Sequence, residues 1–163
     1  MLDLALAEGW DKSSAREIRE QANLFEPHYY HINRQYANFI LPKWYGTDGE
    51  AEYFVEEAAD RIGGEQGDFL YFELATVEVC SCKADKPSMA GLSWSRIRRG
   101  YAVVNQLYGV NDTKANRFAL MAYAADDKAS AREAFAKVGD DLSYGVWRSR
   151  QNFADAKAWA MTE

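Results

Sequence analysis

The sequence predicts an all-α protein, a short irregular tetratricopeptide-like array of antiparallel helix pairs with about eight to ten helices. Alanine, the strongest helix former, occurs 25 times in 163 residues, and there are only three prolines. The spacing in residues 112–145 also fits a tetratricopeptide-type hairpin, with small residues at Ala119, Ala122 and Ala131 and a large one at Phe135. Small residues at these positions let two antiparallel helices approach closely.

Five helices are expected in the first half of the chain. The second and the fourth begin at capping boxes, Ser14–Glu17 and Thr47–Glu50, in which a hydroxyl and a carboxylate each satisfy a free backbone amide. Helix-breaking residues separate the five helices: Gly9, Pro27, Pro42, Gly63 and Gly64. The expected ranges are 2–8, 14–25, 28–41, 49–62 and 67–82.

A linker is expected at 83–92, because this stretch is polar, contains Pro87 and Gly91, and shows no periodicity. It connects an aromatic-rich N-terminal half to a repeat-like C-terminal half within one helical domain, 1–163. Ser93 is placed to cap the helix that follows. The helices expected after the linker are 94–108, 112–125, 127–138, 143–149 and 152–161.

Composition excludes several classes of partner. A net charge of -6 and an isoelectric point near 5.0 argue against nucleic acid, because binding phosphates needs a basic face. No apolar run approaches the roughly 20 residues that span a bilayer, so we expect no membrane contact. Asp3 and the absence of a basic stretch exclude a secretory signal at the start of this sequence. We therefore expect a cytoplasmic protein with reduced cysteines.

The chain resembles a bacterial tetratricopeptide-like helical domain that has no established function and is found towards the C-terminus of longer proteins. Four segments carry the resemblance: LPKWYGTDGEAEYFVEEAADRIGGEQGDFLYFELA (41–75), SWSRIRRGY (93–101), LYG (107–109) and NRFALMAYAADD (116–127). It covers residues 2–160 approximately and implies a helical fold, but it implies no catalytic residue and no cofactor.

A position late in a longer polypeptide is also expected from the repeat register. In that register Met1 would fall inside the first helix of a repeat. Leu2, Leu4 and Leu6 then give the first helix an apolar face that an upstream domain of the same polypeptide would cover.

A metal site is the main chemical alternative. The two histidines, His28 and His31, and the two cysteines, Cys80 and Cys82, could together supply the four ligands of a tetrahedral zinc site. However, two residues that are two positions apart on a helix project about 200° from each other. We therefore expect no metal. An enzyme or metal-binding domain that uses these four residues remains the alternative.

Glu73 needs a partner, because it lies among Leu70, Leu74 and Val77 on a helix that should be buried. An unpaired carboxylate in such a place is costly. We expect its partner to be either Arg96 or Arg99.

Trp44 and Tyr45 are two large aromatic residues in a loop beside a glycine. They either fill the core or form an exposed anchor for a partner. The chain has 5 tryptophans, 10 tyrosines and 8 phenylalanines, most of which must lie inside, so we favour the core. If exposed, they are the candidate partner-binding residues. Because no catalytic motif is present, we expect a non-enzymatic protein–protein interaction module or scaffold, with a protein as its partner.

Overall fold

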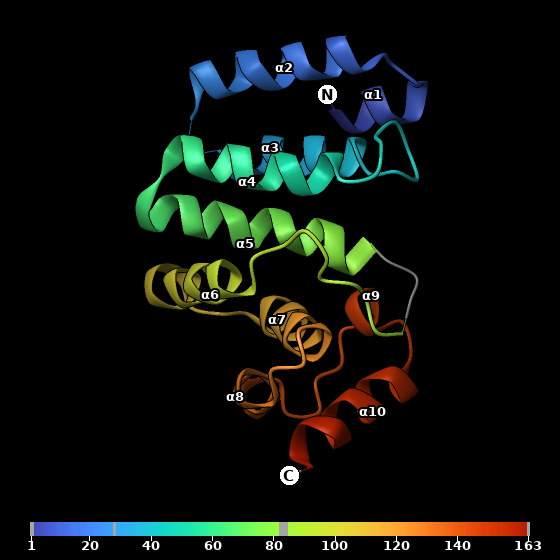
Figure 1. The fold of residues 1–163 in the computed structure, drawn as a ribbon, viewed down its shortest axis with the longest axis vertical. Helices are drawn as coiled ribbons and strands as arrows, with labels where there is room; N and C mark the ends of the chain where they lie inside the picture. The colour runs from blue at the N-terminus through green and yellow to red at the C-terminus, as the bar shows by residue number, and fades with distance from the viewer. Residues whose placement is uncertain (1, 28, 82–84, 163) are drawn as a thin grey trace.

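The computed structural model describes residues 2–27, 29–81 and 85–162, which form ten helices and no strand (Figure 1). The prediction of an all-α array is therefore confirmed. The helices are α1 (Leu2–Glu8), α2 (Lys12–Phe25), α3 (Tyr30–Phe39), α4 (Glu50–Ile62), α5 (Gly64–Ser81), α6 (Trp94–Tyr108), α7 (Asp112–Ala124), α8 (Lys128–Val138), α9 (Tyr144–Trp147) and α10 (Arg150–Met161).

The start of α2 differs from the prediction. Asp11 caps this helix, and its carboxylate accepts a hydrogen bond from the Ser14 amide at 3.0 Å. The hydroxyls of Ser13 and Ser14 also donate to Asp11. The expected capping box at Ser14 is therefore wrong, because an aspartate three residues earlier takes the capping role.

The helices are stacked along the long axis of the molecule, with the two ends of the chain at opposite ends of the stack (Figure 1). The α5 helix lies in the middle and packs against α3, α4, α6 and α7. It is buried on all sides through much of its length, including Leu70, Tyr71, Phe72, Leu74 and Ala75. A helix that is apolar all round is a core helix, and α5 is the core of this fold.

Two glycines allow the close packing around α5. A Cβ atom at Gly100 of α6 would lie 2.0 Å from the carbonyl oxygen of Asp68. A Cβ atom at Gly67 would lie 2.5 Å from the carbonyl oxygen of Ala59 in α4. The helices on both sides of α5 can approach this closely only because these positions have no side chain.

The hairpin of α7 and α8 matches the prediction. Ala119, Ala122 and Ala131 are fully buried, and Phe135 is 1% exposed. The Phe135 ring stacks 5.7 Å from Trp147 of α9. The small residues thus face the close approach of the two helices, and the large one fills the space between them and α9.

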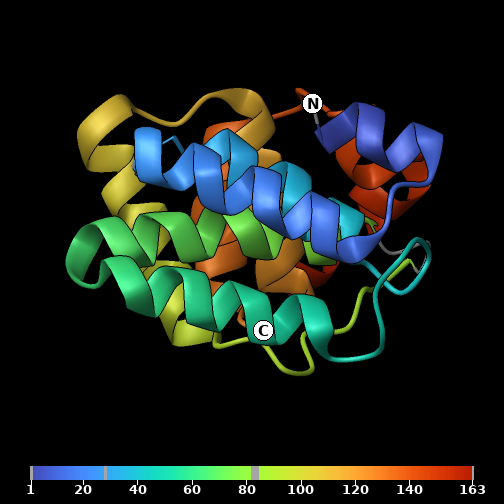
Figure 2. The same ribbon diagram turned by 90° about the horizontal axis from the view of Figure 1, so that it is seen from above.

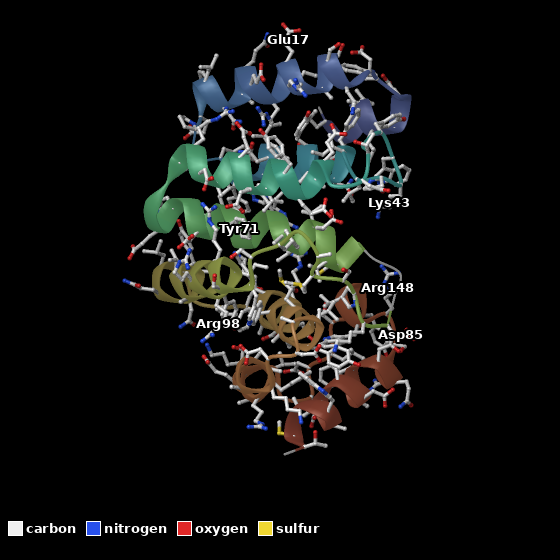
Figure 3. The ribbon with its side chains drawn as sticks, viewed as in Figure 1. Glu17, Lys43, Tyr71, Asp85, Arg98 and Arg148 are labelled. Atoms are coloured by element: carbon white, nitrogen blue, oxygen red, sulfur yellow. The ribbon has the colours of Figure 1, made fainter. Side chains whose placement is uncertain are left out.

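The linker residues that the structure describes contact the C-terminal helices. Asp85 accepts a hydrogen bond of 2.9 Å from the Asn152 amide of α10. Lys86 pairs with Asp126, in the turn between α7 and α8. Figure 3 shows Asp85 and Arg148 on the same side of the molecule, next to α9. The linker is therefore attached to the surface of the repeat-like half.

The apolar face of α1 packs largely within the chain. Leu2 and Ala5 are buried, and Leu6 is partly buried against the core. Leu4 is half exposed. Of the three leucines that we expected to face an upstream domain, only Leu4 is presented to solvent.

Glu73 is buried between two cations that come from other helices than expected. Arg34 of α3 donates to its Oε2 at 3.2 Å, and the Lys114 ammonium of α7 lies 2.6 Å from its Oε1. Arg34 also donates to the Thr76 hydroxyl at 2.6 Å. The predicted partners on α6 are therefore wrong.

The predicted partners, Arg96 and Arg99, instead bind Asp68, with nitrogen–oxygen distances of 3.1 Å and 2.6 Å. Asp68 precedes Glu73 by five residues, which is a rotation of about 140° around the helix. Asp68 and Glu73 thus face different neighbours, and α6 covers the side of α5 that carries Asp68.

Candidate functional site

The residues of the possible zinc site are only partly described. His28 and Cys82 lie outside the described residues. His31 is exposed and stacks on Tyr30, with 4.1 Å between the ring centres. Burial raises the pKa of the Cys80 thiol to about 11, so this thiol is protonated at neutral pH and poorly suited to bind a metal or attack a substrate. Within the described ranges, no three His, Cys, Asp or Glu side chains form a group that could hold a metal ion.

The two aromatic residues of the loop after α3 have different environments. Tyr45 stacks on the buried ring of Phe39 at 4.7 Å, and its hydroxyl donates to the carbonyl oxygen of Leu6 at 3.3 Å. Trp44 is 51% exposed and Tyr45 is 37% exposed, so the expected core position is wrong for both residues. Lys43 projects from the same loop in Figure 3. Tyr45 fixes the loop to α1 and α3, and Trp44 is left on the surface.

A second candidate site lies beneath α2. This helix runs along α3, with α4 beside it (Figure 2). Only Ala15 and Arg19 of α2 are buried. Below the C-terminal half of α2 there is a pocket of ≈ 550 Å³, within the range of ligand-binding pockets. Its wall includes Asn23, Leu24, Pro27, Asn33, Ile62 and Leu70.

Two large apolar side chains are exposed at the end of α2, next to this pocket. Leu24 is 86% exposed and the adjacent Phe25 is 91% exposed. Both lie in the last turn of α2, and Leu24 also lines the pocket. Adjacent large apolar side chains beside a pocket are typical of interaction sites rather than of an inert surface.

Arg19 is the only charged residue among the buried side chains of α2, with 5% exposure. Its guanidinium lies 5.1 Å from the ring centres of both Tyr36 and Phe54. The nearest carboxylate oxygens are those of Glu20 at 3.6 Å and Glu57 at 4.0 Å, too far for good hydrogen bonds. Within the described part of the chain, the Arg19 Nε is buried without a hydrogen-bond partner.

Burial lowers the pKa of Arg19, and the Glu57 carboxylate opposes this shift. An arginine nevertheless stays charged at neutral pH. The pocket wall therefore contains a buried positive charge whose hydrogen-bonding capacity is largely unused.

Two asparagine amides add polar groups to the same wall. Asn23 and Asn33 donate to each other, both at 3.1 Å, and Asn33 is buried. This exchange uses one N–H of each amide, and the second N–H of each has no hydrogen-bond partner among the residues that the structure describes. The pocket thus combines an apolar surface, a buried cation and amide donors.

This pocket is not evident from the sequence alone. The available signal was a charged residue, Arg19, on the same helical stripe as Ala15 and Ala22. A charge on the inner face of an amphipathic helix is unusual and indicates a special role. The pocket itself depends on how α2 is placed over α3 and α4, which local patterns do not determine.

No family model matches the chain, and neither a curated protein nor a solved structure shows a significant similarity to it. In the part of the chain that the structure describes, no helix combines the length and apolar character needed to cross a membrane.

Proposed function

We propose that this chain is a non-enzymatic interaction module and that it binds an apolar peptide segment of a partner protein in the pocket beneath α2. The observation that carries the proposal is the exposed Leu24, which lines a pocket of ≈ 550 Å³, together with the exposed Phe25 that follows it in the sequence. Fully burying a leucine or phenylalanine side chain contributes about 1.5–3 kcal/mol, so a partner that covers both gains substantial affinity.

The arrangement of the helices supports this interpretation. The α7–α8 hairpin has the small-residue pattern of a tetratricopeptide-like repeat, and helical arrays of this kind use their extended surfaces to bind other proteins. Trp44, which is exposed on the loop after α3, provides a second aromatic side chain for a large partner. Contact by exposed aromatic anchors is common in protein interfaces.

The experiment is a selection from a random peptide library displayed on phage, followed by affinity measurements with synthetic peptides. We expect selected peptides to bind the wild-type chain and to bind the Leu24→Ser/Phe25→Ser variant about tenfold or more weakly. Tyr144→Ser is the matched control, because Tyr144 is exposed on α9, which lies on the other side of α5 from α2 (Figure 1). If no enriched peptide depends on Leu24 and Phe25, or if the control loses affinity equally, the proposal is wrong.

A further inference from the structure

We infer that the pocket beneath α2 is a carboxylate-binding site. In this site Arg19 binds a ligand carboxylate that is adjacent to an apolar group of the same ligand. This inference rests on the proposed function and specifies the peptide segment: it carries either a free C-terminal carboxylate or an Asp or Glu side chain. The observation that carries it is the buried guanidinium of Arg19, which has only distant carboxylate neighbours and whose Nε has no hydrogen-bond partner among the described residues.

The existing acidic neighbours do not satisfy Arg19. Glu57 uses its other oxygen to bind Arg61 of the same helix, so its carboxylate is shared between two arginines. Glu20 is half exposed and therefore well solvated. A ligand carboxylate can instead form charge-assisted hydrogen bonds with the guanidinium, which are stronger where water is excluded.

The surroundings of Arg19 determine what else the ligand must carry. Leu24, Ile62 and Leu70 give the pocket apolar walls, which favour an aliphatic or aromatic side chain beside the carboxylate. The second N–H groups of Asn23 and Asn33 can donate to a carboxylate or to a peptide carbonyl. The volume of ≈ 550 Å³ suits a carboxylate with one adjacent apolar side chain rather than a long peptide segment.

The two arginines of the pocket differ in a way that a test can use. Arg19 is buried and its Nε is unpaired, whereas Arg61 is more than half exposed and bound to Glu57. An exposed, already paired charge contributes little to binding. Substituting each arginine separately therefore distinguishes a specific site from a general attraction between the pocket and negative charge.

The test is a titration of the isotope-labelled chain, followed by NMR, with N-acetyl-leucine and with its uncharged analogue N-acetyl-leucinamide. We expect the amide shifts to be centred on α2, α3 and the end of α4, and the acid to bind about 10- to 100-fold more tightly than the amide. Arg19→Met should abolish this preference, whereas Arg61→Gln should retain it. Equal affinity for acid and amide, or a preference lost in Arg61→Gln but kept in Arg19→Met, would overturn the inference.

Circular dichroism checks that Arg19→Met is folded. If it is not, the comparison of acid and amide binding to the wild-type chain decides whether the pocket prefers a carboxylate. Peptides with a free or an amidated C-terminus, and with or without an internal Asp, then identify the source of the carboxylate. If peptides that depend on Leu24 and Phe25 bind equally with and without any carboxylate, the inference fails while the proposed function stands.

Discussion

Lys114 and Glu73 form a buried ion pair, 2.6 Å from nitrogen to oxygen, that connects the two halves of the chain. Glu73 belongs to α5, before the linker, and Lys114 belongs to α7, after it. Because Arg34 of α3 binds the other oxygen of Glu73, a single carboxylate joins three helices.

We predict that Glu73→Ala lowers the free energy of unfolding by about 3–5 kcal/mol, because the change leaves two largely buried cations without their shared partner. Urea denaturation followed by circular dichroism measures the loss. Glu17→Ala is the control, since Glu17 points into solvent from α2 in Figure 3. A loss below about 1 kcal/mol for Glu73→Ala would show that water reaches Arg34 and Lys114.

Glu78 should make the stability of the protein depend on pH. Burial, and then the nearby Glu52 carboxylate, raises the pKa of Glu78 above its usual 4.5, and Lys43 opposes the shift. Below pH 4.5 the residue is protonated in both states. As the pH rises, the unfolded state ionises first, so the folded state loses stability until its own pKa is passed.

We therefore predict that Glu78→Gln raises the free energy of unfolding at pH 7 by about 1 kcal/mol, because the change removes a negative charge whose buried Oε2 has no hydrogen-bond partner among the described residues. The advantage should disappear at pH 3. Denaturant titrations at both values check this, and equal effects at pH 3 and pH 7 would contradict it.

Phe135→Ala should lower the free energy of unfolding by about 3–5 kcal/mol, because it leaves a cavity between α8, Trp147 and Phe153. Thermal and urea unfolding measure this effect. The exposed Tyr144 offers a comparison, and Tyr144→Ala should change stability by less than about 0.5 kcal/mol. Similar values for both variants would mean that the interior can close around the missing ring.

Two glycine-to-alanine changes should have opposite effects on the free energy of unfolding. Gly100→Ala places a methyl group against the Asp68 carbonyl and should cost about 1–3 kcal/mol or more through overpacking. Gly145, in α9, has open space around it, so Gly145→Ala should stabilise by about 0.4–1 kcal/mol. The melting temperatures of the two variants report the difference. An unchanged melting temperature for Gly100→Ala would mean that α5 and α6 can move apart without a loss of stability.

The sequence predicts the helices best where their ends are fixed locally. The helix 94–108 has the predicted bounds, because Ser93 caps its start and Gly109, with a positive φ, follows its end. The start of α2 is less clear from the sequence, because Asp11 competes with Ser14 for the same free amides. Helix boundaries thus depend on neighbours within about one turn, which the sequence displays directly.

Partners that come from distant parts of the chain could not be predicted in the same way. Glu73 was expected to need a cation, and it has two, but which helix supplies them depends on how α3 and α7 are placed around α5. The pocket with Arg19 is a similar case. Its charge is visible in the sequence, whereas the space that Arg19 faces arises only when α2 is placed over α3 and α4.

The central position of α5 has a consequence for how the protein unfolds. Its side chains belong at once to the packing with α3 and α4 and to the packing with α6 and α7. Neither half can unfold without exposing one side of this helix to water. The unfolding of one half is therefore coupled to the unfolding of the other. Heating should therefore melt the chain in a single cooperative transition, with equal calorimetric and van't Hoff enthalpies, although the linker suggests two separable parts.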